Sequence, residues 1–404
     1  MDPLSGRGSP GDLFAKCDSP RVQEYRMAEA LGLLPYFREM DSESGPVVDH
    51  DGRQVIMLGS NNYLGLTGDA RVKRAALDAV ERYGSGCTGS RLMNGSLPLH
   101  RELETELADW TGTEACLVFT TGYTANLGLI STLVSSRDAV FVDSSGHASL
   151  IDGGRLASGT LKSFRHNSVT SLNRRLKEWM ATAEGGALVA VDGVYSMEGD
   201  LAPLGPVADV CAATGARLLV DEAHALGVLG PEGAGAAADA GVQPDLVMGT
   251  FSKSLGSCGG FVGGPTDVID YLRVSCRPFL FTASGVPAAM AAALAATRIA
   301  RDEDWRRDAV RDRADQLRQG LCHLGYQAGP EHSAAIVAVQ IGDDWHAARL
   351  WRCLLDLGVY TNCAVSPAVA PGSALLRTSV IATHTEAQID RALDAFEVAR
   401  STLA

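Results

Sequence analysis

The chain has 404 residues, of which 46% are hydrophobic and 21% charged, and this ordinary globular composition excludes a disordered or collagen-like chain. The net charge is −13, whereas general binding to nucleic acid or to anionic membranes needs a cationic face, so we expect neither kind of partner. A local basic pocket for a phosphorylated ligand is still compatible with this charge.

The first 60 residues form an N-terminal segment with two expected elements. Helical periodicity predicts a helix over residues 22–33. The Asp51-Gly52 pair, which follows His50, is typical of the tight turn of a β-hairpin.

Residues 61–290 alternate short apolar runs with amphipathic stretches of helical length, which predicts a large α/β domain. The runs lack an alternation of apolar and polar residues, as is typical of strands that helices cover on both faces. We therefore expect a mostly parallel sheet wrapped by helices. They are Ala115–Thr120, Ala139–Asp143, Ala187–Asp192, Arg217–Asp221 and Asp245–Thr250. Each ends in a polar residue, and ligands bind beyond the carboxyl ends of such strands, so these side chains should share one crevice.

Residues 291–404 differ in composition from residues 61–290, and their pattern predicts a smaller α+β domain. Helices are expected near 305–324, near 345–357 and from Thr385 onward, with strands at 335–340 and 375–381. The longest apolar stretch, Ala283–Thr297, contains Gly285 and Pro287 and is shorter than the ~20 residues that span a bilayer. It predicts a buried helix that Pro287 opens.

Nine cysteines are present without a C-x-x-C pair, and the first residues lack an apolar core of signal-peptide length. We expect a cytoplasmic protein with reduced thiols and no stable membrane insertion. The nine histidines lack metal-ligand spacing, so no metal site is expected. The glycines of 84–90 and 256–264 fit neither a P-loop nor a dinucleotide-binding fingerprint.

Two segments together indicate a chemistry. The first segment is LLVDEAHALGVLG (218–230), in which an apolar strand ends at Asp221 and His224 follows three residues later. The second is DLVMGTFSKSLGSCGG (245–260), in which another apolar strand is followed by Lys253. Lys253 follows Asp221 by about one βαβ unit of ~30 residues, so the two strand ends are candidates for neighbours. A lysine beside a carboxylate suits pyridoxal 5′-phosphate (PLP), which the lysine binds as a Schiff base while the carboxylate keeps the pyridine nitrogen protonated.

With these motifs, and with FTTGYTAN (119–126) and DSSGHASLIDG (143–153), the chain resembles the α-oxoamine synthases from about residue 30 to its end. This is a PLP-dependent family of fold type I that includes serine palmitoyltransferase and 8-amino-7-oxononanoate synthase. The resemblance implies that Lys253 is the Schiff-base lysine and general base and that Asp221 is the partner of the pyridinium nitrogen. It further implies that His224 donates to the cofactor's phenolic oxygen, that His147 stacks on the ring, and that Ser196 lies near that oxygen.

The resemblance also implies a phosphate site. Gly122 and Tyr123 would offer backbone amides at a helix N-terminus, which favours an anion, and Thr250 and Ser252 would add hydroxyl donors. Thr282 matches a residue that reaches the phosphate from the other subunit, which implies an obligate homodimer with a shared active site. The chain departs from the family at Gly285-Val286-Pro287, where two prolines are usual, and this leaves the local shape of that contact open.

For the amino-acid substrate, Arg377 matches the arginine that clamps the carboxylate, a bidentate task that suits its planar guanidinium. Asn61, in GSNNYLGL, matches an asparagine near the same carboxylate. The glycine-rich segment 84–95 would line the substrate side. His100 and Glu104, one helical turn apart, are expected to be structural.

The implied reaction is a decarboxylative condensation of an amino acid with an acyl thioester, carried by coenzyme A or by an acyl carrier protein, to give an α-aminoketone. The segment SGCTGSRLMNGSLPLHRELE, together with LLPYFREM near the start, resembles bacterial serine palmitoyltransferase-like enzymes, and this resemblance favours serine as the substrate, then alanine, then glycine. Two alternatives are another fold-type-I PLP enzyme, such as an aminotransferase, and a non-catalytic synthase-like subunit. Such subunits commonly lack the lysine that is present here as Lys253.

Overall fold

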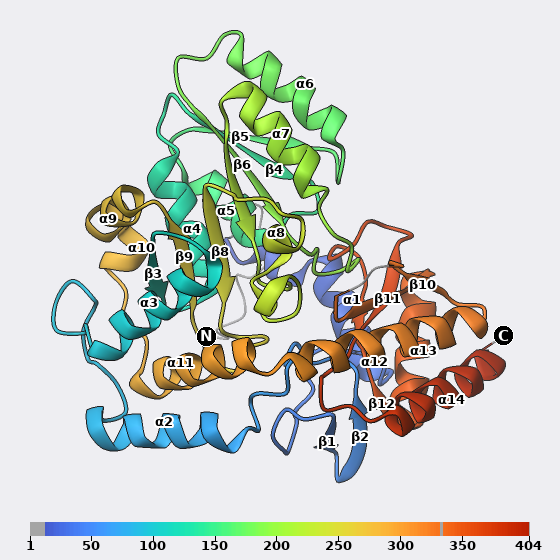
Figure 1. The fold of residues 1–404 in the computed structure, drawn as a ribbon. Helices are drawn as coiled ribbons and strands as arrows, with labels where there is room; N and C mark the ends of the chain where they lie inside the picture. Colours follow the sequence, from blue (N-terminus) through green and yellow to red (C-terminus); the bar gives the residue numbers. More distant parts are fainter. Residues whose placement is uncertain (1–12, 332–333, 404) are drawn as a thin grey trace, which may run out of the picture.

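The computed structural model of the chain describes residues 13–331 and 334–403, and its centre is a seven-stranded sheet. In spatial order the strands are β3 (Ala115–Phe119), β9 (Gly260–Gly264), β8 (Leu246–Thr250), β7 (Arg217–Asp221), β6 (Ala187–Asp192), β4 (Ala139–Asp143) and β5 (Thr160–Phe164). The sheet is parallel except for β9, which runs antiparallel to β3 and β8. The five predicted strands and their mostly parallel arrangement are confirmed (Figure 1).

Two strands of the large sheet, β5 and β9, had no counterpart in the sequence analysis. The edge strand β5 reads TLKSF and is only partly buried, so it lacks an apolar run. In β9, glycines take the place of large apolar residues because neighbouring backbone comes very close. A Cβ atom on Gly260 would lie 2.6 Å from Cα of Gly122.

Helices cover both faces of this sheet, and alternate residues of each strand pack into opposite cores, as on β4. Val140 and Val142 belong to the same buried cluster as Leu129 of α4, whereas Phe141 belongs with Leu172 of α6 to the cluster on the other face. The helices of this region are α4 (Gly122–Leu133), α5 (Ala148–Leu156), α6 (Val169–Met180), α7 (Leu204–Thr214), α8 (Ala236–Asp239), α9 (Thr266–Ser275) and α10 (Arg277–Leu280). Burial on both faces explains the continuous apolar runs.

Three further helices lie beside the large sheet, where α11 (Pro287–Asp302) packs against both α2 (Ala70–Tyr83) and α3 (Pro98–Thr111) (Figure 1). Pro287 opens α11 at its first residue, as the sequence analysis predicted. The expected domain boundary at residue 290 therefore falls inside a continuous helix.

The C-terminal part is a small α+β unit. Its antiparallel sheet has the order β10 (Gln327–Gly329), β11 (Ile336–Gly342), β14 (Ala374–Ser379) and β13 (Asn362–Ala364). The helices are α12 (Asp304–His323), α13 (Asp344–Asp356) and α14 (Glu386–Leu403), close to the predicted ranges.

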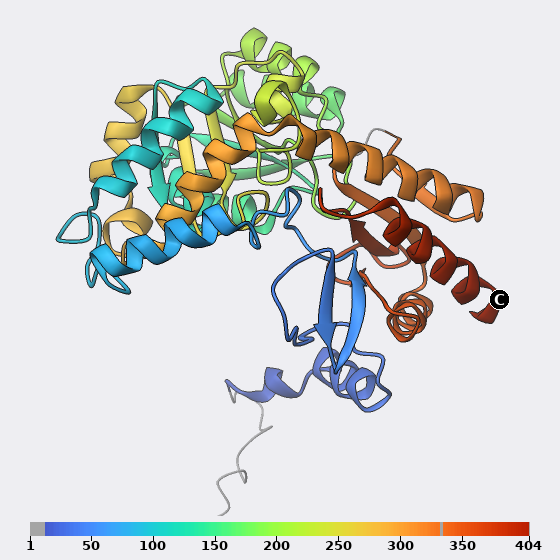
Figure 2. The same cartoon turned by 60° about the horizontal axis from the view of Figure 1, so that its bottom comes forward.

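The N-terminal segment contains α1 (Pro20–Ala30) and the predicted hairpin of β1 (Val47–His50) and β2 (Arg53–Met57). Asp51 and Gly52 both have positive φ, as that turn requires. Strand β12 (Val359–Tyr360) pairs in parallel with β2, so the hairpin belongs with the small unit (Figure 2). Among the described residues, no helix combines the length and apolar character needed to cross a membrane.

Candidate active site

The carboxyl ends of the parallel strands bring several of the predicted polar residues to one edge of the sheet. Asp192 and Asp221 are partners in the register of β6 and β7, and both are buried. Burial, and then the charge of Asp221, raise the pKa of Asp192 well above its ordinary value. Asp143, at the end of β4, pairs with His166 at 2.9 Å.

Lys253 lies in the loop after β8, next to the strand that ends at Asp221, as the spacing predicted. Its Nζ lies 2.9 Å from Nε2 of His224. Burial, together with the cation of Arg377, lowers the pKa of Lys253 to about 8, although Asp221 and Asp192 act in the opposite direction. Burial and the charge of Lys253 lower the pKa of His224 well below its ordinary value, so this imidazole is neutral at pH 7.

A chain of hydrogen bonds connects Asp221 to His147. Asn126 Nδ2 donates to Asp221 Oδ2 at 2.7 Å and to Ser149 Oγ at 2.9 Å, and this hydroxyl lies 2.7 Å from His147 Nδ1. The backbone amide of His147 donates to Asp192 Oδ2 at 3.0 Å. Asn126 was not among the expected site residues, although it lies within the quoted motif FTTGYTAN.

Arg377 is buried on β14 of the small unit, and its guanidinium reaches across to the large domain. Nη2 donates to Asn61 Oδ1 at 2.9 Å and to the Tyr63 hydroxyl at 3.1 Å, and Nε donates to the carbonyl of Ser196. Among the described residues, Nη1 has no hydrogen-bond partner. Three residues that the sequence analysis singled out, Asn61, Ser196 and Arg377, are thus brought together.

Tyr63 is the main residue that sequence reasoning missed. Its hydroxyl lies 2.6 Å from His224 Nδ1 and so connects the Arg377 group to the Lys253 group. Tyr63 stands in the quoted motif GSNNYLGL, but a single tyrosine among glycines and asparagines gives no signal of such a contact.

The expected phosphate site also comes together. Helix α4 begins at Gly122, directly against Thr250, and a Cβ atom on Gly122 would lie 3.0 Å from Cβ of Thr250. The hydroxyls of Thr250 and Ser252 are 3.3 Å apart. The amides of Gly122 and Tyr123 are in the first turn of α4, where helical amides lack an acceptor within the helix. This end of α4 therefore suits an anion.

Thr282 lies in the segment between α10 and α11. It lines a small cavity with Thr120 and Phe119, and in the described part of the chain it makes no hydrogen bond with the residues named above. The hydroxyl of the neighbouring Ser284 lies 3.1 Å from His100 Nε2. The backbone amide of Ser284 donates to the carbonyl of Gly89 in the glycine-rich segment.

His100 and Glu104 are structural, as expected. His100 Nδ1 accepts from the amide of Leu97 and so caps α3. Glu104 forms a buried ion pair with Arg91 and accepts from the amide of Val118 on β3.

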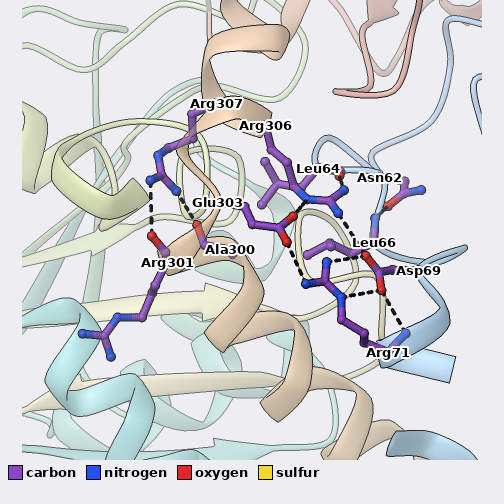
Figure 3. Close-up of polar contacts among 10 residues, drawn as sticks. All are labelled: Asn62, Leu64, Leu66, Asp69, Arg71, Ala300, Arg301, Glu303, Arg306 and Arg307. Carbon is purple, nitrogen blue, oxygen red and sulfur yellow. Dashed lines mark hydrogen bonds and ion pairs between the residues drawn. The ribbon is translucent and has the colours of Figure 1, made fainter. Parts of the chain in front are cut away.

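The loop that carries Asn61 and Tyr63 is held from the start of α12 (Figure 3). Arg306 donates Nη1 to the carbonyl of Leu64 at 2.6 Å, Nη2 to Asp69 at 2.9 Å and Nε to Glu303 at 2.8 Å. Arg71 pairs with the same two carboxylates. Hydrogen bonding to Arg71 is the main cause that lowers the pKa of Asp69 to about 2.

The donor set fits PLP. The Lys253 amine stands beside the neutral imidazole of His224 and close to the buried carboxylate of Asp221. The N-terminus of α4 lies against Thr250 at the end of β8, the strand next to the one that ends at Asp221. These are the groups that an aldehyde, a pyridine nitrogen, a phenolic oxygen and a phosphate would need. In the described residues, no cluster of side chains could hold a metal ion.

Comparison with known proteins gives a consistent result. Residues 53–396 match the family model described as aminotransferase class I and II. The chain is 44% identical over 375 residues to "Serine palmitoyltransferase" of Caulobacter vibrioides, with 92% of each chain covered. It is 44% identical over 366 residues to "Putative 8-amino-7-oxononanoate synthase" of Gloeobacter violaceus, with 90% of this chain and 93% of the other covered.

Among solved structures, a serine palmitoyltransferase variant from S. paucimobilis with a bound PLP-myriocin aldimine is very similar to the chain. Its TM-score is 0.94 at 40% identity, and the match covers 97% of this chain and 99% of the other.

Proposed function

This chain belongs to the class I and II aminotransferase family and, within it, to the α-oxoamine synthases, and we propose that Lys253, Asp221, His224 and His147 are its catalytic residues. The observation that carries the proposal is the contact of Lys253 with His224 beside the buried Asp221. The cofactor residues would then be these four with Gly122, Tyr123, Ser196, Thr250, Ser252 and Thr282.

The enzyme is a PLP-dependent acyltransferase that condenses an amino acid with an acyl thioester. A bond forms between the α-carbon and the acyl carbon, while the thioester C–S bond and the bond to the carboxylate break. The products are an α-aminoketone, CO₂ and the free thiol. When bound, PLP acts as the electron sink that stabilises negative charge at the α-carbon.

The residues of this chain would hold the substrate and move its proton. Lys253, whose pKa is lowered to about 8, has a free-amine fraction at neutral pH that can accept the α-proton. Arg377 would bind the substrate carboxylate through its unpaired Nη1, and Asn61 fixes the orientation of the guanidinium. His147, which the Asp221–Asn126–Ser149 chain orients, would cover one face of the cofactor.

We propose serine as the amino acid, ahead of alanine and glycine. The support is that several relatives 40–44% identical over most of the chain bear the name serine palmitoyltransferase. By the same argument the acyl group would be a long-chain thioester of coenzyme A or of an acyl carrier protein.

We also propose a cytoplasmic homodimer. All nine cysteines are free, which suits a reducing compartment. The support for a shared site is that Thr282 matches the α-oxoamine synthase residue that reaches the phosphate from the other subunit; within the described residues it makes no hydrogen bond to the proposed cofactor residues.

The testing experiment is a matrix of serine, alanine and glycine against long-chain acyl thioesters of coenzyme A and of carrier protein. We expect serine with a long-chain acyl thioester to give stoichiometric thiol and CO₂ and a product whose mass is that of the α-aminoketone. Lys253→Ala should give none of them. Amino-group transfer from serine without any thioester would favour the aminotransferase alternative.

A further inference from the structure

The hydroxyl of Tyr63 contacts three groups of the site at once. It lies 2.6 Å from His224 Nδ1, 3.1 Å from Asn61 Oδ1 and 3.1 Å from Arg377 Nη2. The side chain of Tyr63 is fully buried. The amide of Ala382 donates to the Tyr63 carbonyl at 2.7 Å and so holds the backbone at this residue. The hydroxyl therefore stays between the lysine side and the carboxylate side of the site.

The protons in this group can be assigned from the chemistry of each partner. A phenol has one proton to donate and two lone pairs, and a guanidinium only donates, so Arg377 donates to Tyr63. Asn61 Oδ1 already accepts from Arg377 at 2.9 Å, and it lies farther from the phenol than His224 Nδ1 does. Tyr63 can donate its single proton either to Asn61 Oδ1 at 3.1 Å or to His224 Nδ1 at 2.6 Å, and the shorter contact favours Nδ1.

The neutral imidazole of His224 carries a single N–H. If Nδ1 accepts from Tyr63, this N–H is on Nε2, which faces Lys253 Nζ at 2.9 Å. In the other tautomer Nδ1 would donate to Tyr63, and Nε2 could only accept.

Given the proposed function, we propose that Tyr63 is a positioning residue that keeps His224 in the Nε2–H tautomer and couples this state to Arg377. When PLP is bound, Lys253 would no longer be a free ammonium, and the Nε2–H of His224 would then be available to donate to the cofactor's phenolic oxygen. The Tyr63 hydroxyl also fixes the guanidinium that would receive the substrate carboxylate.

Tyr63→Phe removes the hydroxyl and keeps the ring, and Tyr326→Phe is the matched control. The Tyr326 hydroxyl donates to the carbonyl of Phe396 in the small unit, away from the site. In the holoenzyme labelled with ¹⁵N-histidine, we expect the protonated nitrogen of His224 to be Nε2 in the wild type and in Tyr326→Phe. In Tyr63→Phe the proton should shift partly or wholly to Nδ1, because Nδ1 has lost its donor.

Steady-state kinetics gives a second readout. The KM for serine should rise by about fivefold in Tyr63→Phe, the size of one lost hydrogen bond, while the KM for the thioester stays unchanged. The effects of Tyr63→Phe and Arg377→Lys on the KM for serine should be non-additive, because the two side chains share one contact.

A wild-type His224 protonated on Nδ1 would overturn the assignment, as would a Tyr63→Phe variant whose ¹⁵N spectrum and KM for serine match those of Tyr326→Phe. If instead the wild type neither binds PLP nor turns over serine, the proposed function fails and not only the role of Tyr63. Circular dichroism and thermal unfolding of both variants show whether each is folded.

Discussion

At the scale of single residues, the lowered pKa of Lys253 has a direct consequence for cofactor loading. Only the free amine attacks an aldehyde, so protonation blocks the reaction. The rate of covalent PLP loading of the apoenzyme should rise with pH through about 8 and level off above it. Stopped-flow absorbance between about pH 6 and pH 10 measures this rate.

Arg377 provides the variant for this prediction, because its cation is one cause of the lowered pKa of Lys253. Arg377→Gln should move the midpoint of the loading profile to higher pH, since the ammonium is then less disfavoured. Arg352→Gln, on the surface of α13 and paired with Asp356, is the matched control and should leave the midpoint in place. A wild-type midpoint near that of an ordinary lysine would contradict the structure.

At the scale of elements, the site depends on how the start of α12 holds the loop of Asn61 and Tyr63 (Figure 3). Arg306→Met keeps the apolar stem but leaves the Leu64 carbonyl without its donor and Asp69 with Arg71 alone. Removal of one partner of a buried charge cluster costs about 3 kcal/mol of unfolding free energy. We also expect a higher KM for serine, since the loop that places Asn61 and Tyr63 loses an anchor.

The control for Arg306 is on the same helix. Arg311 is exposed and pairs with Asp308, so Arg311→Met should cost no more than about 0.5 kcal/mol and should leave the KM for serine unchanged. Urea unfolding of both variants measures the difference. Equal unfolding free energies would show that the Arg306 cluster contributes nothing to stability.

At the scale of the whole molecule, the proposed dimer predicts a mass of about twice 42.4 kDa by light scattering. If Thr282 serves the partner's site, a mixture of Lys253→Ala and Thr282→Ala subunits should form hybrids with one intact site. Refolded together in equal amounts, they should regain roughly a quarter of the wild-type activity. No gain over the separate variants would place Thr282 outside the shared site.

The sequence by itself determined five of the seven strands of the main sheet and predicted the residues at the centre of the site. The five strands that were predicted are readable because burial on both faces requires continuous apolar runs, and this pattern is local in the sequence. Asp221, His224 and Lys253 follow two of these runs directly, so the parallel order of the strands was enough to predict that they meet.

Only the tertiary structure decided the contacts between distant segments. Tyr63 meets His224 across 161 residues and Arg377 across 314, and Arg306 reaches the Leu64 carbonyl across 242. The antiparallel insertion of β9 and the pairing of β12 with β2 likewise join segments without local periodicity. Such contacts depend on how whole elements pack, and the residue types along one stretch of chain carry no record of that packing.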